Sequence, residues 1–195
     1  KMALGSPQWM YKSGEAYEID QSLKFESGDE SRLTFTPSTA GNRRTGTFSC
    51  WMKRSSNTDS HNVLFSAHLD RSVIRFTGDH LRITDFGYSG ADGTVWSLVT
   101  NQDFRDFGGW MSIIVAYDTT QGTAANRVKL YVNGERVTSF SSETYPAQNR
   151  DTWWSSTQEH HIGDRLSYGG SPTQWFDGYL SEVNFIDGQA LTPAD

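Results

Sequence analysis

Short segments in which apolar and polar residues alternate follow one another along most of the chain. Leu23 and Phe25 alternate with polar neighbours, and Leu33 and Phe35 do the same. Further segments of this kind are Thr47–Lys53, Val63–Ala67, Val73–Phe76, Leu81–Thr84, Trp96–Thr100, Met111–Tyr117, Val128–Val132, Arg136–Phe140, His160–Gly163 and Tyr179–Ile186. A period of two is typical of strands, and the intervening Gly, Asn, Asp and Ser residues favour turns. The pattern predicts an all-β fold, an antiparallel jelly-roll β-sandwich.

Two of these segments indicate where their strands lie. Asn133 and Gly134 separate two strand-like segments, and both residue types tolerate the positive φ angles of a two-residue hairpin. Met111–Tyr117 is almost continuously apolar, which is typical of a strand covered on both faces. We therefore expect a hairpin at Asn133-Gly134 and a central strand at Met111–Tyr117.

The first residues of the chain show no clear period and contain Gly5, Pro7 and Gly14. We interpret residues 1–21 as an N-terminal arm and residues 22–195 as one domain. The arm carries Trp9, Met10 and Tyr11 in succession. An exposed cluster of such side chains would be sticky, so we expect an assembly role in which they dock on this domain or on a neighbouring subunit.

Charge and cysteine content exclude several classes of function. The 195 residues carry a net charge of -6 and no cluster of Lys and Arg, which argues against a nucleic-acid partner. No apolar run approaches the ~20 residues of a membrane-spanning helix, and no signal-peptide pattern begins the chain, so we expect folding in a cytoplasm. The single cysteine, Cys50, excludes an internal disulfide. It shares a strand face with Phe48 and Met52, which predicts a buried structural thiol.

Several segments, in order, resemble the laminin-G, pentraxin and concanavalin A-like lectin/glucanase superfamily. They are Gly46–Lys53, Trp110–Asp118, Val128–Glu135, His161–Gly163 and Phe176–Phe185. The resemblance covers roughly Ser22 to Asp195 and implies a sandwich of the concanavalin A-like or LamG-like type. It implies little about activity, because many functions share this fold.

Four shorter segments resemble, more narrowly, the LamG-like domains of structural proteins from marine tailed phages. They are Asn42–Thr45, Asp118–Gln121, Tyr145–Asn149 and Ile186–Leu191. This resemblance implies a non-catalytic bacteriophage module on the virion surface, of the capsid-decoration, head-fibre or tail-fibre type. Its expected partners are other virion proteins and host surface glycans, and analogy suggests a homo-oligomer such as a trimer. A dedicated carbohydrate-binding lectin is the alternative.

Catalysis is disfavoured by the distribution of carboxylates. Glycosidases need two carboxylates about 5 to 10 Å apart across the scissile bond. The glucanases of the resembled superfamily carry a set of three on one strand, whereas the nearest match here is Glu18 and Asp20 in the arm, without a third. No G-x-S-x-G nucleophile elbow occurs. We therefore expect no catalytic residues.

Aromatic residues outside the strand patterns are the candidates for binding. Trp153 and Trp154 are adjacent, so one indole would face outward if the segment is extended. Further candidates in polar or Gly-rich loops are Tyr88, Tyr145, Tyr168 and Trp175. Such rings serve as glycan platforms, as subunit contacts or as parts of the core, and the sequence leaves all three open. Trp51 and Trp110 lie inside strand patterns and are expected in the core.

Calcium is the candidate cofactor, because the resembled superfamily often holds it at the rim of the sandwich. Aspartates near predicted strand ends are the candidate ligands: Asp103, Asp106, Asp118, Asp164 and Asp177. The alternative is that they cap turns. His160 and His161 are adjacent on a predicted strand and point to opposite faces, so at most one could join a given site and zinc is not expected.

Overall fold

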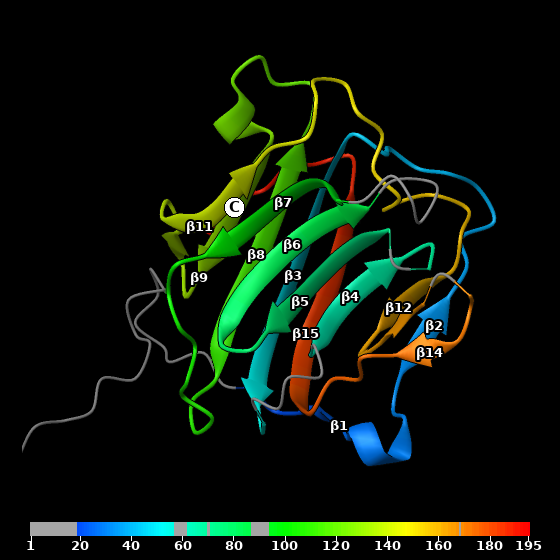
Figure 1. Ribbon diagram of the computed structural model, residues 1–195, viewed down its shortest axis with the longest axis vertical. Helices are drawn as coiled ribbons and strands as arrows, with labels where there is room; N and C mark the ends of the chain where they lie inside the picture. Colours follow the sequence, from blue (N-terminus) through cyan, green and yellow to red (C-terminus); the bar gives the residue numbers. More distant parts are fainter. Residues whose placement is uncertain (1–18, 57–61, 70, 87–93, 168) are drawn as a thin grey trace, which may run out of the picture.

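The computed structural model describes residues 19–56, 62–69, 71–86, 94–167 and 169–195 (Figure 1). Within these ranges two antiparallel sheets pack face to face, which confirms the predicted all-β sandwich. Trp9, Met10 and Tyr11 of the arm, Glu18, and the loop candidates Tyr88 and Tyr168 lie outside the described residues. None of the described helices is long and apolar enough to cross a membrane.

The first sheet has six strands in the order β1-β15-β3-β8-β9-β10. They are β1 (Leu23–Phe25), β15 (Gly178–Asp187), β3 (Thr45–Arg54), β8 (Met111–Asp118), β9 (Val128–Val132) and β10 (Glu135–Arg136). The strand nearest the C-terminus thus lies between two strands from the first third of the chain. This pairing brings the two ends of the described chain into one sheet.

The second sheet has seven strands in the order β11-β7-β6-β5-β4-β12-β2. They are β11 (Phe140–Thr144), β7 (Thr94–Thr100), β6 (His80–Phe86), β5 (Ser72–Thr77), β4 (Val63–Ala67), β12 (His160–Ile162) and β2 (Leu33–Phe35). A small separate pair joins β13 (Arg165–Leu166) to β14 (Pro172–Thr173). The described helices are two short 3-10 turns, η2 (Ser27–Asp29) and η3 (Ala124–Asn126).

The predictions made from short sequence patterns are confirmed where the pattern itself decides the backbone conformation. Asn133 and Gly134 have φ angles of 51° and 82° and join β9 to β10, which confirms the hairpin. Met111–Tyr117 forms most of β8, between β3 and β9, and all of it is buried except the half-buried Ile114. The predicted strand Arg136–Phe140 is wrong. The chain there leaves the first sheet at Arg136 and enters the second at Phe140, so the intervening residues cross between sheets.

Strand alternation decides which β3 side chains enter the core. Phe48, Cys50 and Met52 are buried between the sheets, and burial raises the pKa of the Cys50 thiol, as expected of a structural cysteine. Trp51 therefore points to the outer face of the six-stranded sheet, where it is half-buried. Trp110 immediately precedes β8 and is also half-buried. The prediction that both tryptophans are core residues is wrong, because the pattern located their strands but not the face that each indole occupies.

Candidate functional site

The four segments that carry the narrower resemblance meet at one end of the sandwich. Backbone hydrogen bonds run from Thr119 to the Arg44 carbonyl (2.8 Å) and from Asn149 to the Thr119 carbonyl (2.8 Å). A third runs from Gly188 to the Thr45 carbonyl (3.0 Å). Residues up to 145 positions apart are thus held together. We call this surface, formed by residues 41–45, 118–121, 145–156 and 186–191, the loop end.

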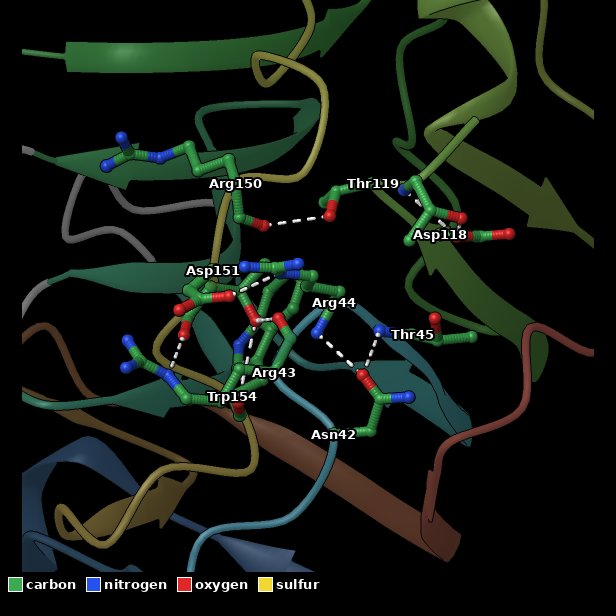
Figure 2. Close-up of polar contacts among 11 residues, drawn as sticks. Asn42, Arg43, Arg44, Thr45, Asp118, Thr119, Arg150, Asp151 and Trp154 are labelled. Atoms are coloured by element: carbon green, nitrogen blue, oxygen red, sulfur yellow. Dashed lines mark hydrogen bonds and ion pairs between the residues drawn. The ribbon is translucent and has the colours of Figure 1, made fainter. Parts of the chain in front are cut away.

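Side chains fix the conformation of the loop end (Figure 2). The Asn42 side-chain oxygen accepts hydrogen bonds from the backbone N–H groups of Arg44 (3.0 Å) and Thr45 (3.1 Å). The Arg44 guanidinium donates to the Asp151 carboxylate at 2.7 Å. Asn42, Arg44 and Asp151 therefore stabilise the conformation of these loops, and this structural role explains their arrangement.

Trp153 and Trp154 occupy a turn rather than an extended segment, and their environments differ. Trp154 is only 1% exposed and contacts the rings of Trp96 (centroid distance 6.3 Å) and Tyr117 (5.0 Å). The prediction that Trp154 serves as a glycan or interface residue is therefore wrong: it belongs to the core.

Trp153 is the half-buried member of the pair. The Arg43 guanidinium carbon lies 4.9 Å from the centre of its ring system, and the imidazole of His68 stacks on it at 4.1 Å. The Arg43 side chain is itself held by a 2.7 Å hydrogen bond to the Thr152 carbonyl. The Trp153 indole of the loop end thus holds the Arg43 guanidinium on one hand and the imidazole of His68, which follows β4, on the other.

The other described aromatic candidates are not gathered around Trp153 as one platform. Tyr145 belongs to the loop end, where it is half-buried against the core and donates a 2.7 Å hydrogen bond to Glu143. Trp175 follows β14 and is also half-buried, with the guanidinium of Arg32 at 5.3 Å from its ring. Arg32 immediately precedes β2, so Trp175 belongs to a different part of the surface.

Two of the five candidate calcium ligands cap their own turns. Asp106 accepts a 2.8 Å hydrogen bond from the backbone N–H of Gly108. Asp118 accepts hydrogen bonds from the backbone of Thr120 (3.0 Å) and the amide of Gln121 (2.6 Å). This is the capping arrangement that the sequence left as the alternative to metal binding.

The other three aspartates have separate partners. Asp103 forms an ion pair with Arg105 (2.9 Å), and Asp164 lies 2.8 Å from Nδ1 of His161. Asp177 accepts hydrogen bonds from the backbone and hydroxyl of Ser27, at 2.6 and 2.9 Å. The structure therefore does not bring the five aspartates together, and in the described ranges no group of three or more His, Cys, Asp or Glu could hold a metal ion.

His160 and His161 face opposite sides of β12, as predicted. The His160 ring stacks on Phe35 at 4.9 Å and lies 5.8 Å from Phe65 of the core. His161 turns to the other side, toward Asp164. Both histidines are buried, so they pack the sheet and do not form a ligand pair.

Asp85 is a fully buried carboxyl beneath the loop end that the sequence did not single out. It accepts a 3.1 Å hydrogen bond from Ser72, and its ion pair with Arg150 is long, at 3.5 Å. Burial raises the pKa of Asp85 to about 6, and the positive charge of Arg150 offsets only part of this effect. A buried carboxyl that faces Arg150 of the loop end thus has a pKa well above its ordinary value.

We expect Asp85 to make stability pH-dependent. Its pKa is higher in the folded chain than its ordinary value of 3.8, so the folded state binds more protons between about pH 4 and pH 6. The free energy of unfolding therefore falls as the pH rises through this window, by up to about 3 kcal/mol at about 1.4 kcal/mol per pKa unit. Urea denaturation at pH 4, 5, 6 and 7 measures this slope, which Asp85→Asn should reduce. The exposed Asp29→Asn, away from the loop end, is the control, and an unchanged slope in Asp85→Asn would contradict the expectation.

The sequence analysis missed an apolar groove at one edge of the sandwich. Leu23 of β1 and Leu33 and Phe35 of β2 are large apolar residues that are 56%, 48% and 46% exposed. β1 and β2 are the end strands of the six- and seven-stranded sheets, respectively, as described (Figure 1). Their alternating pattern looked like that of any strand, and nothing in it showed that they lie at sheet edges.

Two hollows accompany these exposed side chains. The first, of about 330 Å³, lies between Leu23 and Leu33 and is also lined by Ile162 and Val183. The second, of about 390 Å³, is lined by Phe35, Pro37, His160, Phe185 and Asp187. Strands β2, β12 and β15 contribute to both hollows, and we call them together the edge groove. It lies between the edges of the two sheets, and its lining combines these apolar side chains with the carboxylates of Glu182 and Asp187.

The two face-to-face antiparallel sheets, closed by loops at their ends, define a concanavalin A-like sandwich. The chain belongs to the Laminin_G_3 family of the concanavalin A-like lectin/glucanases superfamily, whose model matches residues 27–195. No curated protein matches the chain significantly.

Solved structures share the fold at low sequence identity. Domains LG4-5 of the mouse laminin alpha1 chain align with a TM-score of 0.59 and 13% identity, covering 91% of this chain and 44% of that one. The native heptameric SAP-like pentraxin from Limulus polyphemus aligns at 0.56 and 16%, covering 83% and 71%. The CBM40 of the Ruminococcus gnavus IT-sialidase, bound to alpha2,3 sialyllactose, aligns at 0.57 and 11%, covering 85% and 95%. The fold is therefore one that carbohydrate-binding and adhesion modules commonly use.

Proposed function

We propose that this chain is a non-catalytic module of a bacteriophage virion surface, of the decoration, head-fibre or tail-fibre type, that attaches to other virion proteins. The fold supports a binding role, and the four segments of the loop end support the virion setting through their likeness to phage structural proteins. In this proposal the sandwich acts as a rigid scaffold, and association takes place at its surface.

The observation that carries the proposal is the edge groove. Exposed apolar side chains that cluster around a hollow are typical of interaction sites, whereas isolated ones are not. Here Leu23, Leu33 and Phe35 lie along two end strands, beside hollows that could accept side chains of a partner. An end strand also offers backbone groups for pairing with a strand from another chain. The groove therefore suits a protein partner that supplies an extended apolar segment.

The test is a double substitution in the full chain, Leu33→Asp with Phe35→Asp. The double substitution should reduce co-sedimentation of the chain with purified particles of the phage whose genome encodes it by at least about tenfold. The reason is that it places two negative charges in an apolar contact. Both residues are about half exposed, and Phe35 also stacks on the buried His160, so some loss of stability is expected; binding is therefore measured at a temperature at which the unfolding transition shows the double variant to be folded. Ser142→Asp, on the end strand β11 at the opposite edge, is the matched control. Equal co-sedimentation of the unmodified chain, the double variant and Ser142→Asp would refute attachment through the edge groove.

A glycan-binding role is the second candidate, and the contacts of Trp153 favour it. Sugar sites commonly combine aromatic rings with charged or polar groups, and here the Arg43 guanidinium lies over the Trp153 ring and the His68 imidazole stacks on it, so a sugar would contact the edge of this three-residue stack. The hydrogen bonds of the loop end hold this group in place before any ligand arrives, which lowers the entropic cost of binding. Host surface glycans are the expected ligands.

A further inference from the structure

Two polar hollows adjoin at the end of the sandwich where β8 begins, opposite the loop end (Figure 1). The larger hollow, of about 670 Å³, lies beside residues 135–139, and the smaller, of about 180 Å³, lies beside Trp110. Gln102, Val132 and Asn133 line both hollows, so the two form one continuous depression. We call it the polar groove.

Residues 101–106 form one wall of the polar groove and are anchored in the core. The buried ring of Phe104 packs edge-on against Phe76 at a centroid distance of 5.7 Å. The Phe104 carbonyl accepts a 3.0 Å hydrogen bond from the buried Arg54, and its backbone N–H donates to the Asp79 carbonyl at 2.9 Å. This wall therefore has a fixed shape.

The segment that follows β9 forms the opposite wall, and hydrogen bonds tie it to its surroundings. The side-chain oxygen of Asn133 accepts a 2.9 Å hydrogen bond from the backbone N–H of Ser112. The side-chain amide of Asn101 donates to the Ser139 hydroxyl at 2.8 Å, and the Asn101 backbone N–H donates to the Ser139 carbonyl at 3.2 Å. The two walls are thus joined at one end of the groove. A site that is already ordered loses less entropy when it binds a ligand.

Three exposed side chains of the walls keep polar groups available for a ligand. They are the amide of Gln102, the hydroxyl of Thr138 and the carboxylate of Glu135. Within the ranges that the structure describes, none of the three side chains makes a hydrogen bond or an ion pair. An amide and a hydroxyl each donate and accept hydrogen bonds, whereas a carboxylate accepts them. The groove therefore offers both kinds of hydrogen-bonding group to a bound molecule.

Trp110 supplies an aromatic surface in the smaller hollow. The indole is half-buried, and its centroid lies 6.5 Å from that of Tyr179, with the two rings inclined at 60°. The polar groove thus combines one aromatic side chain with several hydrogen-bonding groups in a hollow. The volume of the larger part falls within the range of about 300 to 1,000 Å³ that is typical of small-molecule sites.

We propose that the polar groove binds a neutral oligosaccharide, with one sugar ring against Trp110 and the adjoining sugar in the larger hollow. Each sugar hydroxyl both donates and accepts hydrogen bonds, as the Gln102 amide and the Thr138 hydroxyl also do. The indole provides apolar contact for the C–H groups of the sugar ring. The polar groove is separate from the edge groove and from Trp153, so its ligand does not depend on either role proposed above.

The charges and the apolar residues of the polar groove restrict the class of ligand. The charged residues are of both signs: Asp103, Asp106, Glu135, Arg105 and Arg136. An acidic glycan therefore gains no net attraction from them. The apolar residues of the larger hollow, Val132 and Val137, are buried and half-buried, so an extended apolar peptide has less to contact here than in the edge groove.

The test is an array of neutral oligosaccharides built from glucose, galactose, mannose and N-acetylglucosamine, with sialylated and sulfated oligosaccharides on the same slide. The full chain should bind at least one neutral oligosaccharide. Gln102→Ala should weaken that binding about three- to tenfold, and Trp110→Ala at least about tenfold. Trp153→Ala is the matched control and should still bind the same oligosaccharide.

The result at Gln102 separates lost binding from lost stability, because this side chain is exposed and its removal leaves the core intact. Binding of acidic oligosaccharides alone, or of none on the slide, would overturn the proposal. So would neutral binding that Gln102→Ala and Trp110→Ala both retain in full. Co-sedimentation with phage particles measures attachment through the edge groove and is read independently of the array.

A second readout uses the unmodified chain. Hydroxyl-radical footprinting with a saturating amount of the neutral oligosaccharide that binds best on the array should lower the oxidation of Trp110 severalfold. Oxidation of Trp153 and Trp175 should stay the same, because both lie in other parts of the surface. Protection of Trp153 in place of Trp110 would assign the sugar to the loop end and overturn the proposal.

Discussion

Replacing Trp154 with alanine is expected to lower the free energy of unfolding by about 3 to 5 kcal/mol. The indole is 1% exposed and fills the space between Trp96 and Tyr117, so its removal leaves a cavity that the neighbouring rings cannot fill. Chemical denaturation followed by circular dichroism measures the loss. A change of less than about 1 kcal/mol would contradict the placement of Trp154 in the core.

Trp153→Ala is the matched control, because the same side chain is removed one position earlier. Trp153 is half-buried, and its removal costs the contacts with Arg43 and His68, which we expect to amount to about 1 to 2 kcal/mol. If the glycan candidate is correct, this variant stays folded but loses binding on a glycan array probed with and without calcium. Binding that survives in the folded Trp153→Ala protein would exclude Trp153 as the platform.

Gly178→Ala is expected to destabilise the fold by about 2 to 5 kcal/mol, from backbone strain and steric overlap together. Gly178 begins β15 with a φ angle of 148°, a conformation that side-chain-bearing residues rarely adopt. An added Cβ would lie 2.1 Å from the backbone carbonyl oxygen of Lys53 and 3.1 Å from the Cα of Arg54. Since both contacts are with the backbone of β3, neither can be relieved by a side-chain rotation.

The control for strain alone is Gly170→Ala. Gly170 also has a positive φ, of 81°, but an added Cβ would meet nothing within 4 Å. Its substitution should cost only about 1 kcal/mol. Thermal unfolding of both variants separates the two effects. Equal shifts would show that the overlap with β3 is relaxed in the variant and that the pairing of β15 with β3 is looser than described.

Some predictions from the sequence were correct because short-range rules decide them. Alternation located most strands, and the positive φ angles at Asn133 and Gly134 follow from the residue types alone. Alternation also grouped Phe48, Cys50 and Met52 on one face, but it does not say whether a residue such as Trp51 then lies in the core or outside. Trp154 was misassigned for a related reason: its segment is a turn, so the strand rule did not apply.

The sequence by itself therefore determined the class of fold, the hairpin and which residues of a strand share a face, since these depend on residues a few positions apart. Tertiary structure alone decided the surfaces. The edge groove joins Leu33 to Val183, and the loop end joins Arg44 to Asp151, through the order in which distant strands pair. That order follows from the packing of two sheet faces against each other, to which residues more than a hundred positions apart contribute. The alternation of apolar and polar residues does not reveal this strand order, because the same alternation suits an end strand and a central one.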